Sequence, residues 1–380
     1  RWQWNGGKND GFVTGNPDKD GSDEFAAGYY LEQDVGFLPH AAGAFTLYDR
    51  YFASLLGSTY PNRHYMWSAQ CGGTKTNELP IGSLGQKWET IFDRAQGQGV
   101  SVGYYSSDIP FALLYGTRAL PWIRPVAEFY VDAALGRLPN ICFVDPAFTD
   151  GGGGNGLSGD EHPHGDIRIG QAFMSDITHA FISSPQWRSG AMFINYDEWG
   201  GFFDHVSPQS VPDDRASTNL EENFGITGFR VPGVAISPYA RRGHVSHMTV
   251  THESILKLIS YRFGLGYLNM RHRYASNIGQ SFDWANPDFN VPDLPDPSAP
   301  IPLGIGPGVT APCDIGGAPR GGTASGTQTR SRTGGGEDVE LNSQAMIDYV
   351  ERVGFDYKPW KPSDIFSKPD SVVQSLQGSN

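Results

Sequence analysis

The sequence of 380 residues predicts an α/β protein in which helices pack on the faces of a sheet. Segments with apolar residues at helical spacing alternate along the chain with short apolar runs that are typical of buried strands. The length suffices for one large or two ordinary domains with a sizeable core. The 49 glycines and 27 prolines indicate that many of the connections are irregular loops.

The expected elements follow one another from residue 45 to residue 353. Helices are predicted at 45–56, 88–95, 121–135, 166–182, 250–263 and 338–353, and strands at 100–105, 138–144, 191–194 and 231–236. Gly97 and Gly99 would end the second helix, and Pro121 suits the first turn of the third.

The last part of the chain differs in composition from the rest. Residues 301–336 are rich in Pro, Gly, Ser and Thr, which is typical of a linker or a long surface loop. We therefore expect a main domain at 1–300, this linker, and a helical tail at 337–380.

The chain carries an excess of negative charge. Lys and Arg number 28 and Asp and Glu 41, which gives a formal net charge of −13. Nucleic acids and anionic lipid surfaces are recognised through basic patches, so neither is expected as the main partner. A small anionic substrate stays compatible, because a bound cation can reverse the local charge. No apolar run is long enough to span a bilayer.

The three cysteines are Cys71, Cys142 and Cys313. Their spacing matches no metal site and neither demands nor forbids a disulfide. Cys142 lies in an apolar run and is predicted to be a buried strand thiol.

The most informative stretch is 191–206, AMFINYDEWGGFFDHV. Its apolar start predicts a short strand, which Asp197 and Glu198 follow directly. In α/β proteins ligands bind beyond the carboxyl ends of strands, and glycines let the backbone bend closely there. Alone, the two carboxylates are explained by an ordinary acidic loop. The continuation Gly-Gly-x-x-Asp-His, with Asp204 and His205, favours a metal site.

A second stretch, GSTYPNR at 57–63, places hydroxyl groups at the end of one predicted helix. A metal bound by Asp197 and Glu198 would activate such a hydroxyl as a nucleophile. Arg63 offers a bidentate contact to a phosphoryl group. By itself, the stretch is better explained as a Ser/Thr-Pro turn.

Several histidines are further candidates. His162 and His164 stand beside carboxylates in DEHPH at 160–164, just before a predicted helix. They suit a metal ligand, a general acid or a transition-state donor, and a helix cap is an equal alternative. His252 lies at the start of a predicted helix, where a lone histidine is more often structural.

Several common catalytic motifs are absent from the sequence. There is no P-loop, no Gly-x-Gly-x-x-Gly after a strand, no His-Glu-x-x-His and no Gly-x-Ser-x-Gly. Nucleotide-dependent transfer, zincin proteolysis and the α/β-hydrolase triad are therefore disfavoured.

Taken together, five segments resemble the bacterial phospholipase C/acid phosphatase family of phosphoesterases. They are 46–63, 161–166, 196–206, 229–239 and 252–256, and the segment NGGKNDGF at 5–12 is also similar. The resemblance covers roughly residues 4–290, and the segments occur in the family's order.

This resemblance implies a fold similar to alkaline phosphatase, with a central sheet between helical layers. It also implies metal-dependent cleavage of a phosphate ester through a covalent phosphoenzyme. By motif, Thr59 would be the nucleophile and a metal ligand, Asp197 and Glu198 further metal ligands, and His162 a histidine near the transferred phosphoryl group. Oxygen ligands suit Ca²⁺, Mg²⁺ or Mn²⁺, and Zn²⁺ would suit a site that includes a histidine.

One family segment is missing from residues 1–380. The family's first strand ends in Glu-Asn-Arg-Ser-Phe-Asp, whose Glu and Asn complete the metal site. We expect this strand to precede Arg1, and without it the central sheet would have an open edge or slot. The alternative is a non-catalytic or self-assembling homologue with an incomplete metal site.

The expected substrate is a phospholipid or a small phosphate ester. Tyr60, Tyr65 and Trp67 either line a pocket for its head group or belong to the core. Because the family is mostly exported, we expect a secreted, periplasmic or cell-envelope protein.

Overall fold

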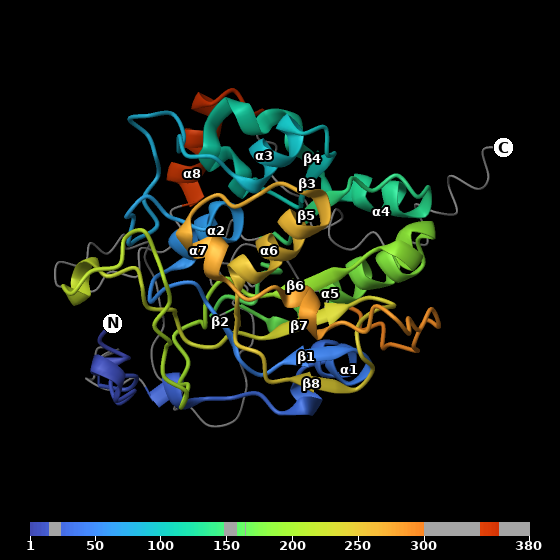
Figure 1. The fold of residues 1–380 in the computed structure, drawn as a ribbon, viewed down its shortest axis with the longest axis horizontal. Coiled ribbons are helices and arrows are strands. Elements are labelled where there is room, and N and C mark those ends of the chain that lie inside the picture. The colour runs from blue at the N-terminus through green and yellow to red at the C-terminus, as the bar shows by residue number, and fades with distance from the viewer. Residues whose placement is uncertain (15–23, 148–157, 164, 300–342, 357–380) are drawn as a thin grey trace, which may run out of the picture.

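The computed structural model describes residues 1–14, 24–147, 158–163, 165–299 and 343–356, and it has a mixed α/β fold (Figure 1). The predicted α/β class is therefore confirmed. The helices are α1 (Leu38–Ala44), α2 (Thr59–Ser68), α3 (Ile91–Gly97), α4 (Val126–Ala134), α5 (Ile167–Ile182), α6 (His252–Phe263), α7 (Met270–Tyr274) and α8 (Ser343–Arg352). The strands are β1 (Thr46–Tyr48), β2 (Tyr51–Phe52), β3 (Val102–Ser106), β4 (Ile123–Pro125), β5 (Ile141–Asp145), β6 (Met192–Asn195), β7 (Gly233–Ile236), β8 (His244–Ser246) and β9 (Val250–Thr251).

These strands form two larger sheets and a small one. The first sheet is parallel, in the order β4-β3-β5. The second has the order β6-β7-β1-β8, with β7 antiparallel to both neighbours and β1 parallel to β8. In Figure 1 the first sheet lies above the second, with β5 and β6 nearest the boundary. Among the described residues, no strand pairs with the outer edge of β5 or of β6.

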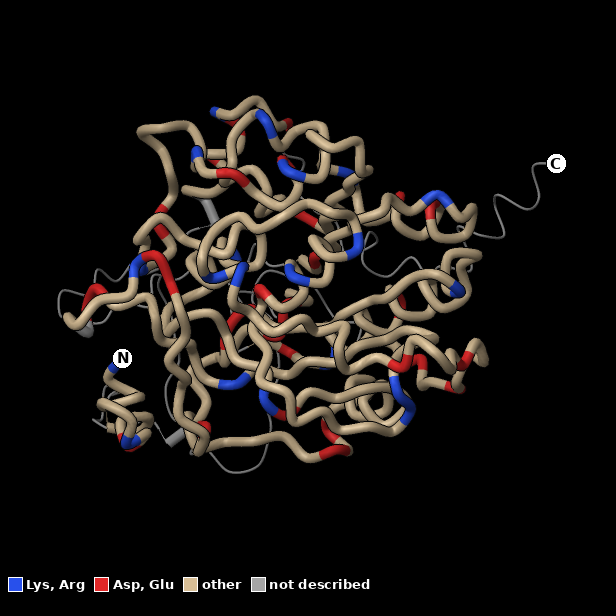
Figure 2. Tube along the Cα trace, viewed as in Figure 1, with Lys and Arg blue, Asp and Glu red and all other residues tan. Residues whose placement is uncertain are grey.

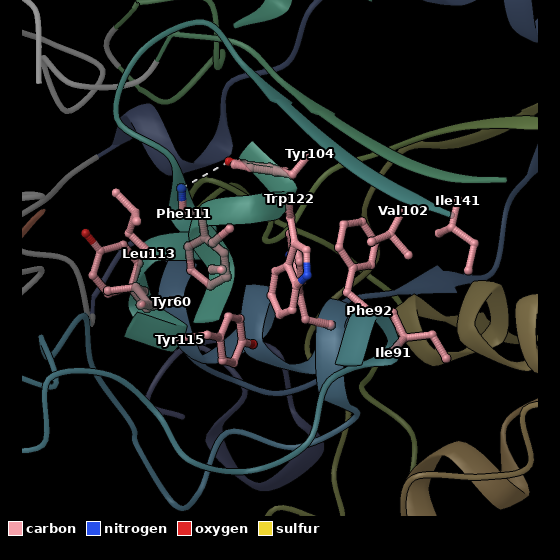
Figure 3. Packing of buried hydrophobic residues seen from close by; sticks show 14 of the residues in the cluster. Tyr60, Ile91, Phe92, Val102, Tyr104, Phe111, Leu113, Tyr115, Trp122 and Ile141 are labelled. Carbon is pink, nitrogen blue, oxygen red and sulfur yellow. Dashed lines mark hydrogen bonds between the residues drawn. The ribbon is translucent and has the colours of Figure 1, made fainter. Parts of the chain in front are cut away.

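The first sheet is covered on both faces. Tyr104 of β3 packs into a core formed with α2, α3, α8 and the 3₁₀ helix η4 (Phe111–Trp122), whereas the next residue, Tyr105, packs into a second core with α4 and α5. Figure 3 shows the first of these cores, where Phe111 and Trp122 of η4 lie among side chains of α3 and β3. Because successive strand residues point to opposite faces, this alternation makes β3 the middle layer of a sandwich.

The predicted helix at 45–56 is wrong. The segment contains β1, which pairs with β7 and β8, and β2, which pairs with β9. Phe45, Tyr48, Tyr51 and Phe52 are all buried. The apolar residues of this segment fall at helical spacing, but its aromatic residues favour strands and its pairing with distant strands decides the outcome.

Most other predicted elements are confirmed with shifted ends. Strands at 100–105, 138–144, 191–194 and 231–236 correspond to β3, β5, β6 and β7, and helices at 88–95 and 166–182 to α3 and α5. The helix predicted from Pro121 begins only at Val126, because Pro121 lies in η4 and the next residues form β4. The helix predicted from Val250 begins at His252, after β9.

The predicted linker, 301–336, lies outside the described residues, and of the predicted tail only 343–356 are described. Within the described ranges, no helix combines the length and apolar character that a membrane span requires. In the view of Figure 2, Lys and Arg positions are scattered among Asp and Glu positions rather than gathered on one face.

Candidate active site

Thr59 is the first residue of α2, and the turn before it is fixed by a buried side chain. The Asn62 amide accepts a hydrogen bond from the Leu55 N–H (3.1 Å) and donates to the carbonyls of Gly57 (2.9 Å) and Ser58 (3.2 Å). Asn62 is fully buried, so these bonds hold the chain in one path up to the helix. The half-buried Thr59 hydroxyl therefore stands at a rigid helix start.

This helix start carries partial positive charge, although its first amides are engaged by the protein or absent. A helix N-terminus carries partial positive charge and presents amides that lack intrahelical partners. The Tyr60 amide donates a hydrogen bond to the Asn77 side chain (2.8 Å), and Pro61 has no amide hydrogen. The Ser58 hydroxyl is buried and makes no hydrogen bond within the described part of the chain. A negatively charged group beside Thr59 would be favoured here.

Arg63 lies one helical turn after Thr59, on the same side of α2. Its guanidinium donates to Asp145 at the end of β5 and lies 4.8 Å over the Phe111 ring. Burial disfavours the charge of Arg63, but the carboxylates of Asp145 and Asp197 outweigh it, so its pKa lies above the ordinary value. Arg63 is thus permanently charged and is held by Asp145, so its guanidinium does not offer both of its terminal NH₂ groups to a ligand.

Asp197 and Glu198 follow β6 on a tight turn. The Glu198 amide donates to the Asp197 carboxylate (3.1 Å), and the Gly200 amide donates to that of Glu198 (2.6 Å). Gly200 and Gly201 have φ angles of 63° and 79°, which only glycine adopts without strain. The two glycines allow the chain to fold back so that both carboxylates stay at the strand end.

The Asp197 carboxyl lies among charges from three segments. Burial raises its pKa above the ordinary value, and Arg63 and His162 oppose this only in part, while Asp160 adds to it. The structure thus places Arg63, which follows Thr59 by four residues on α2, and His162 within electrostatic reach of Asp197.

His162 sits on a loop that touches the Asp197 turn. Its Nδ1 donates to the Pro163 carbonyl (2.6 Å), which leaves Nε2 without a proton in the neutral ring. Its amide donates to the Asp160 carboxylate (3.0 Å). A side chain at Gly200 would lie 3.2 Å from the Pro163 ring, so the two loops pack closely. His162 is half-buried.

Glu161 is a half-buried residue next to this histidine in the sequence. It accepts hydrogen bonds from the Tyr196 hydroxyl (2.5 Å) and the Gln171 amide (2.7 Å). Burial raises the pKa of Glu161 to about 7, although both hydrogen bonds favour the charged form. Its φ of 61° is unusual for a residue other than glycine. Such strain persists where the surroundings fix the residue, and it is common near functional sites.

His252, at the start of α6, is buried behind the Asp197 turn. Its Nε2–H donates to the Tyr196 carbonyl (2.9 Å), and its Nδ1 accepts from the Ser54 hydroxyl (2.8 Å). These partners fix the neutral tautomer, and burial lowers the pKa of His252 to about 4. Both ring nitrogens are therefore engaged by the protein.

A family model with the description Phosphoesterase family matches residues 1–266. The chain belongs to the phosphoesterase family. The resemblance predicted from the sequence segments is confirmed by this match.

Relatives of this phosphoesterase include plant and bacterial proteins. Non-specific phospholipase C6 of Arabidopsis thaliana is 32% identical over 266 residues, which cover 63% of this chain and 51% of that protein. Phospholipase C B of Mycobacterium tuberculosis H37Rv is 32% identical over 343 residues, which cover 78% and 63%. The chain thus spans between half and two thirds of these relatives. The crystal structure of Ps i-CgsB in complex with k-i-k-neocarrahexaose aligns with a TM-score of 0.42 at 12% identity, covering 67% of this chain and 75% of that one.

Two residues of the signature lie in a different setting from Asp197. Asp204 is bound by Arg230 through both nitrogens of a fork, at 2.7 and 2.9 Å, and also accepts from the Val206 amide. His205 is exposed, with Nδ1 3.9 Å from Asp204. Asp204 has the contacts of a structural residue rather than of a metal ligand. His164, also predicted as a candidate, lies outside the described residues.

The phosphoesterase has part of the donor set for a divalent metal ion. Asp197 and Glu198 provide the carboxylate oxygens that hard cations prefer, and the raised pKa of Asp197 shows that its charge is incompletely compensated. However, the described residues contain no group of three or more His, Cys, Asp and Glu side chains that could hold a metal ion. Asp197 and Glu198 could therefore supply some of the ligands of a metal ion, but the described residues do not complete a metal site.

Other sequence candidates have structural roles. Tyr60, Tyr65 and Trp67 are buried in cores, so the head-group alternative for these aromatics is wrong. Cys71 and Cys142 are free thiols, and burial raises the pKa of each to about 12. Cys313 lies outside the described residues.

Sequence reasoning missed Asp145, Glu161, Tyr196 and Ser54. Asp145 ends an apolar strand, so the argument that pointed to Asp197 also applies to it. Glu161 and Tyr196 stand next to candidates in the sequence, but nothing in the pattern shows that they bond to each other. Ser54 has no local signal, because its importance depends on His252, which is 198 positions away.

Proposed function

We propose that this phosphoesterase hydrolyses phosphate esters through Thr59, with a phosphothreonine intermediate, as a phospholipase C or acid phosphatase. The observation that best supports the proposal is that Arg63, on the same helix as Thr59, and His162 both act electrostatically on the Asp197 carboxyl in a member of this family. The metal would be Ca²⁺, Mg²⁺, Mn²⁺ or Zn²⁺, held by Asp197, Glu198 and the Thr59 oxygen. When bound, it would lower the pKa of the Thr59 hydroxyl and neutralise charge on the phosphoryl oxygens.

In the first step, the Thr59 hydroxyl gives its proton to a solvent water, and its oxygen forms a bond to phosphorus on the side opposite the leaving alcohol. The bond between phosphorus and that alcohol breaks, and the departing oxygen takes a proton from the imidazolium of His162. The N-terminus of α2 stabilises the negative charge of the phosphoryl group. Arg63, anchored to Asp145, adds a fixed positive charge nearby.

In the second step, a water attacks phosphorus and gives a proton to the neutral His162. The Thr59–phosphorus bond breaks, and the Thr59 oxygen takes a proton back from solvent water. His162 thus acts as an acid and then as a base. The hydrogen bond from Nδ1 to the Pro163 carbonyl keeps Nε2 as the nitrogen that exchanges the proton.

The substrate class is proposed from the relatives, which are phospholipases C by name. A phospholipid or a small phosphate ester is expected, and the protein is expected to be exported, as the family resemblance implies. Within the described residues, no helix is suited to cross a membrane.

We also propose that the remaining metal ligands are the Glu and Asn that the resemblance places on a strand outside residues 1–380. In support, the outer edges of β5 and β6 bind no strand of the described chain. A strand paired with these edges would end beside Asp145 and Asp197. It would give a continuous central sheet of the alkaline-phosphatase type.

A non-catalytic or self-assembling homologue is the second candidate. The observation in its favour is the incomplete group of metal ligands among the described residues. Such a protein would keep the fold, bind no metal beside Asp197, and show no turnover.

The test uses the full-length protein, including whatever flanks residues 1–380 in nature. Release of p-nitrophenol is measured from p-nitrophenyl phosphate and p-nitrophenylphosphorylcholine, with divalent metals and after chelation. We expect turnover that Thr59→Ala abolishes. The matched control is Thr90→Ala, which removes the N-cap hydroxyl of α3 and costs about 1 kcal/mol of stability but leaves kcat unchanged. Full activity of Thr59→Ala would refute the nucleophile, and no turnover with any metal would favour the second candidate.

A further inference from the structure

Three loops must keep a fixed spacing for the proposed reaction, and two residues join all three. The loops are the nucleophile turn (54–58), the histidine loop (158–163) and the carboxylate turn (196–201). Tyr196 opens the carboxylate turn, and its hydroxyl donates to Glu161 of the histidine loop (2.5 Å). Its carbonyl accepts from His252, whose other nitrogen accepts from Ser54 of the nucleophile turn (2.8 Å).

We propose that His252 is a positioning residue that locks the nucleophile turn to the carboxylate turn, and that Tyr196 extends this lock to the histidine loop. The inference rests on the proposed function, because it assigns these residues a role in that reaction. His252 itself touches neither Thr59 nor a substrate. It acts through Ser54, five positions before Thr59, and through Tyr196, directly before Asp197.

The lock is rigid because its parts are buried and fully engaged. Ser54 and His252 are about 0–1% exposed, so neither bond competes with water. With Nδ1 accepting and Nε2 donating, only the neutral tautomer with hydrogen on Nε2 makes both bonds. A flip or protonation of the ring would break one of them.

A buried cluster of charged side chains also binds Ser54, through its main chain. Arg271 of α7 donates to the carbonyl of Ser54, so this residue is bound through both its side chain and its main chain. The Arg271 guanidinium lies 3.3 Å from Asp213 and 3.4 Å from Glu253, the neighbour of His252, and all three side chains are buried. Such a cluster gives little net stability but fixes geometry. Ser54 is therefore the fixed point from which the chain runs to Thr59.

The chemistry explains why this spacing matters. In-line attack on phosphorus requires the nucleophile and the group that stabilises charge to be aligned, and a displacement of about 1 Å can cost about 10²-fold in rate. If the lock fails, the substrate still binds at the surface, but Thr59 and Asp197 no longer hold one alignment. The expected effect is therefore on kcat and not on KM.

The variants separate the two bonds of His252. His252→Ala removes both, His252→Gln keeps an amide N–H near the position of Nε2, and His252→Asn keeps an oxygen near the position of Nδ1. We expect kcat to fall by about 10²-fold in His252→Ala and to recover partly in each amide variant, with KM within about twofold. Ser54→Ala should lower kcat by about tenfold and add little further loss in the background of His252→Ala.

The control is His272, a second buried histidine at the start of a helix, whose pKa is also lowered to about 4 by burial. Its ring accepts a hydrogen bond from the Leu268 amide, and this partner lies outside the three loops. His272→Gln should lower the melting temperature to a degree similar to His252→Gln but leave kcat unchanged. Equal kcat losses in both would show that the effect is one of general stability.

The results of these assays distinguish failure of the proposed lock from failure of the proposed phosphoesterase reaction. All assays are run at least 15 °C below each melting temperature, and Thr59→Ala is measured alongside. An inactive Thr59→Ala together with full kcat in His252→Ala and Ser54→Ala overturns the lock alone. If His252→Ala does not fold, His252→Gln, His252→Asn and Ser54→Ala decide the question. Additive losses in the Ser54 and His252 double variant would also contradict the proposal.

Discussion

Two aspartates in one signature, Asp197 and Asp204, have opposite environments. Burial raises the pKa of Asp197, because Arg63 and His162 only partly balance its charge. Burial would also raise the pKa of Asp204, but the fork of Arg230 outweighs this and the pKa lies below the ordinary value. The incompletely balanced carboxylate is suited to bind a cation, and the fully bonded one is suited to hold the loop. Membership of a motif therefore does not distinguish the two roles, whereas the partners of each carboxylate do.

The largest expected difference is in activity. Asp197→Asn should lower kcat/KM by about 10³-fold, because it removes a charge that acts on the reacting group. In metal-free protein its free energy of unfolding should stay equal or rise by about 1 kcal/mol, since a neutral amide relieves the cost of burying a charge. Steady-state assays and urea unfolding in chelator measure the two effects. A marked loss of stability without loss of activity would reverse the assignment.

The companion variant, Asp204→Asn, should behave in the opposite way. It weakens a half-buried ion pair with Arg230 and should lower the free energy of unfolding by about 1–3 kcal/mol, while folded molecules keep their kcat. Because the folded-state pKa of Asp204 is depressed, its stabilisation is present above the unfolded-state pKa and is lost as the pH falls through the folded one. Urea unfolding between pH 7 and pH 3 should therefore show a shallower acid loss in the variant. An unchanged acid profile would contradict this role.

Glu161 gives a smaller effect with the opposite dependence on pH. Its pKa is raised from 4.5 to about 7 in the folded state, so its contribution is greatest below the unfolded-state value and is lost as the pH rises from about 4.5 to about 7. Glu161→Gln keeps a group that can bond to Tyr196 and should flatten this part of the stability profile. Unfolding curves at pH 4.5, 6 and 7.5 test the prediction. The prediction would be contradicted if the wild type became more stable from pH 4.5 to pH 7.5 and Glu161→Gln lost that increase.

The smallest effect is expected at the end of the signature. His205 is exposed and forms only a long contact to Asp204. His205→Ala should change the free energy of unfolding by less than about 0.5 kcal/mol and leave kcat unchanged. A tenfold loss of activity would show that His205 takes part in the reaction.

The elements that the sequence predicted well have a distinct period or a cap. Helix α5 begins after the Asp166 cap at the expected residue, and β6 ends just before Asp197 as its apolar run implies. Residues 45–56 were mispredicted because their apolar residues fall at helical spacing although the segment forms strands. Their strand state depends on β7 and β8, which lie about 190 residues later.

The candidate site was predictable only where its residues carry motifs. Thr59, His162 and Asp197 stand in recognisable segments, whereas the bonds that hold them come from residues far away in the sequence. Asp145 reaches Arg63 across 82 positions, and Ser54 reaches His252 across 198. Such pairs form only when the chain folds, so no local sequence pattern predicts them. The same limit made Asp204 look equivalent to Asp197, since its partner Arg230 lies outside the signature.

The most direct test of the account is to locate the phosphoryl group during turnover. The full-length protein is mixed with p-nitrophenyl phosphate, quenched in acid within the first turnover, digested, and analysed by mass spectrometry. The account predicts one phosphoryl group on Thr59, present in the wild type and in Thr90→Ala and absent in Thr59→Ala. Rapid product release with Thr59 unmodified, or with the phosphoryl group on another residue, would contradict it.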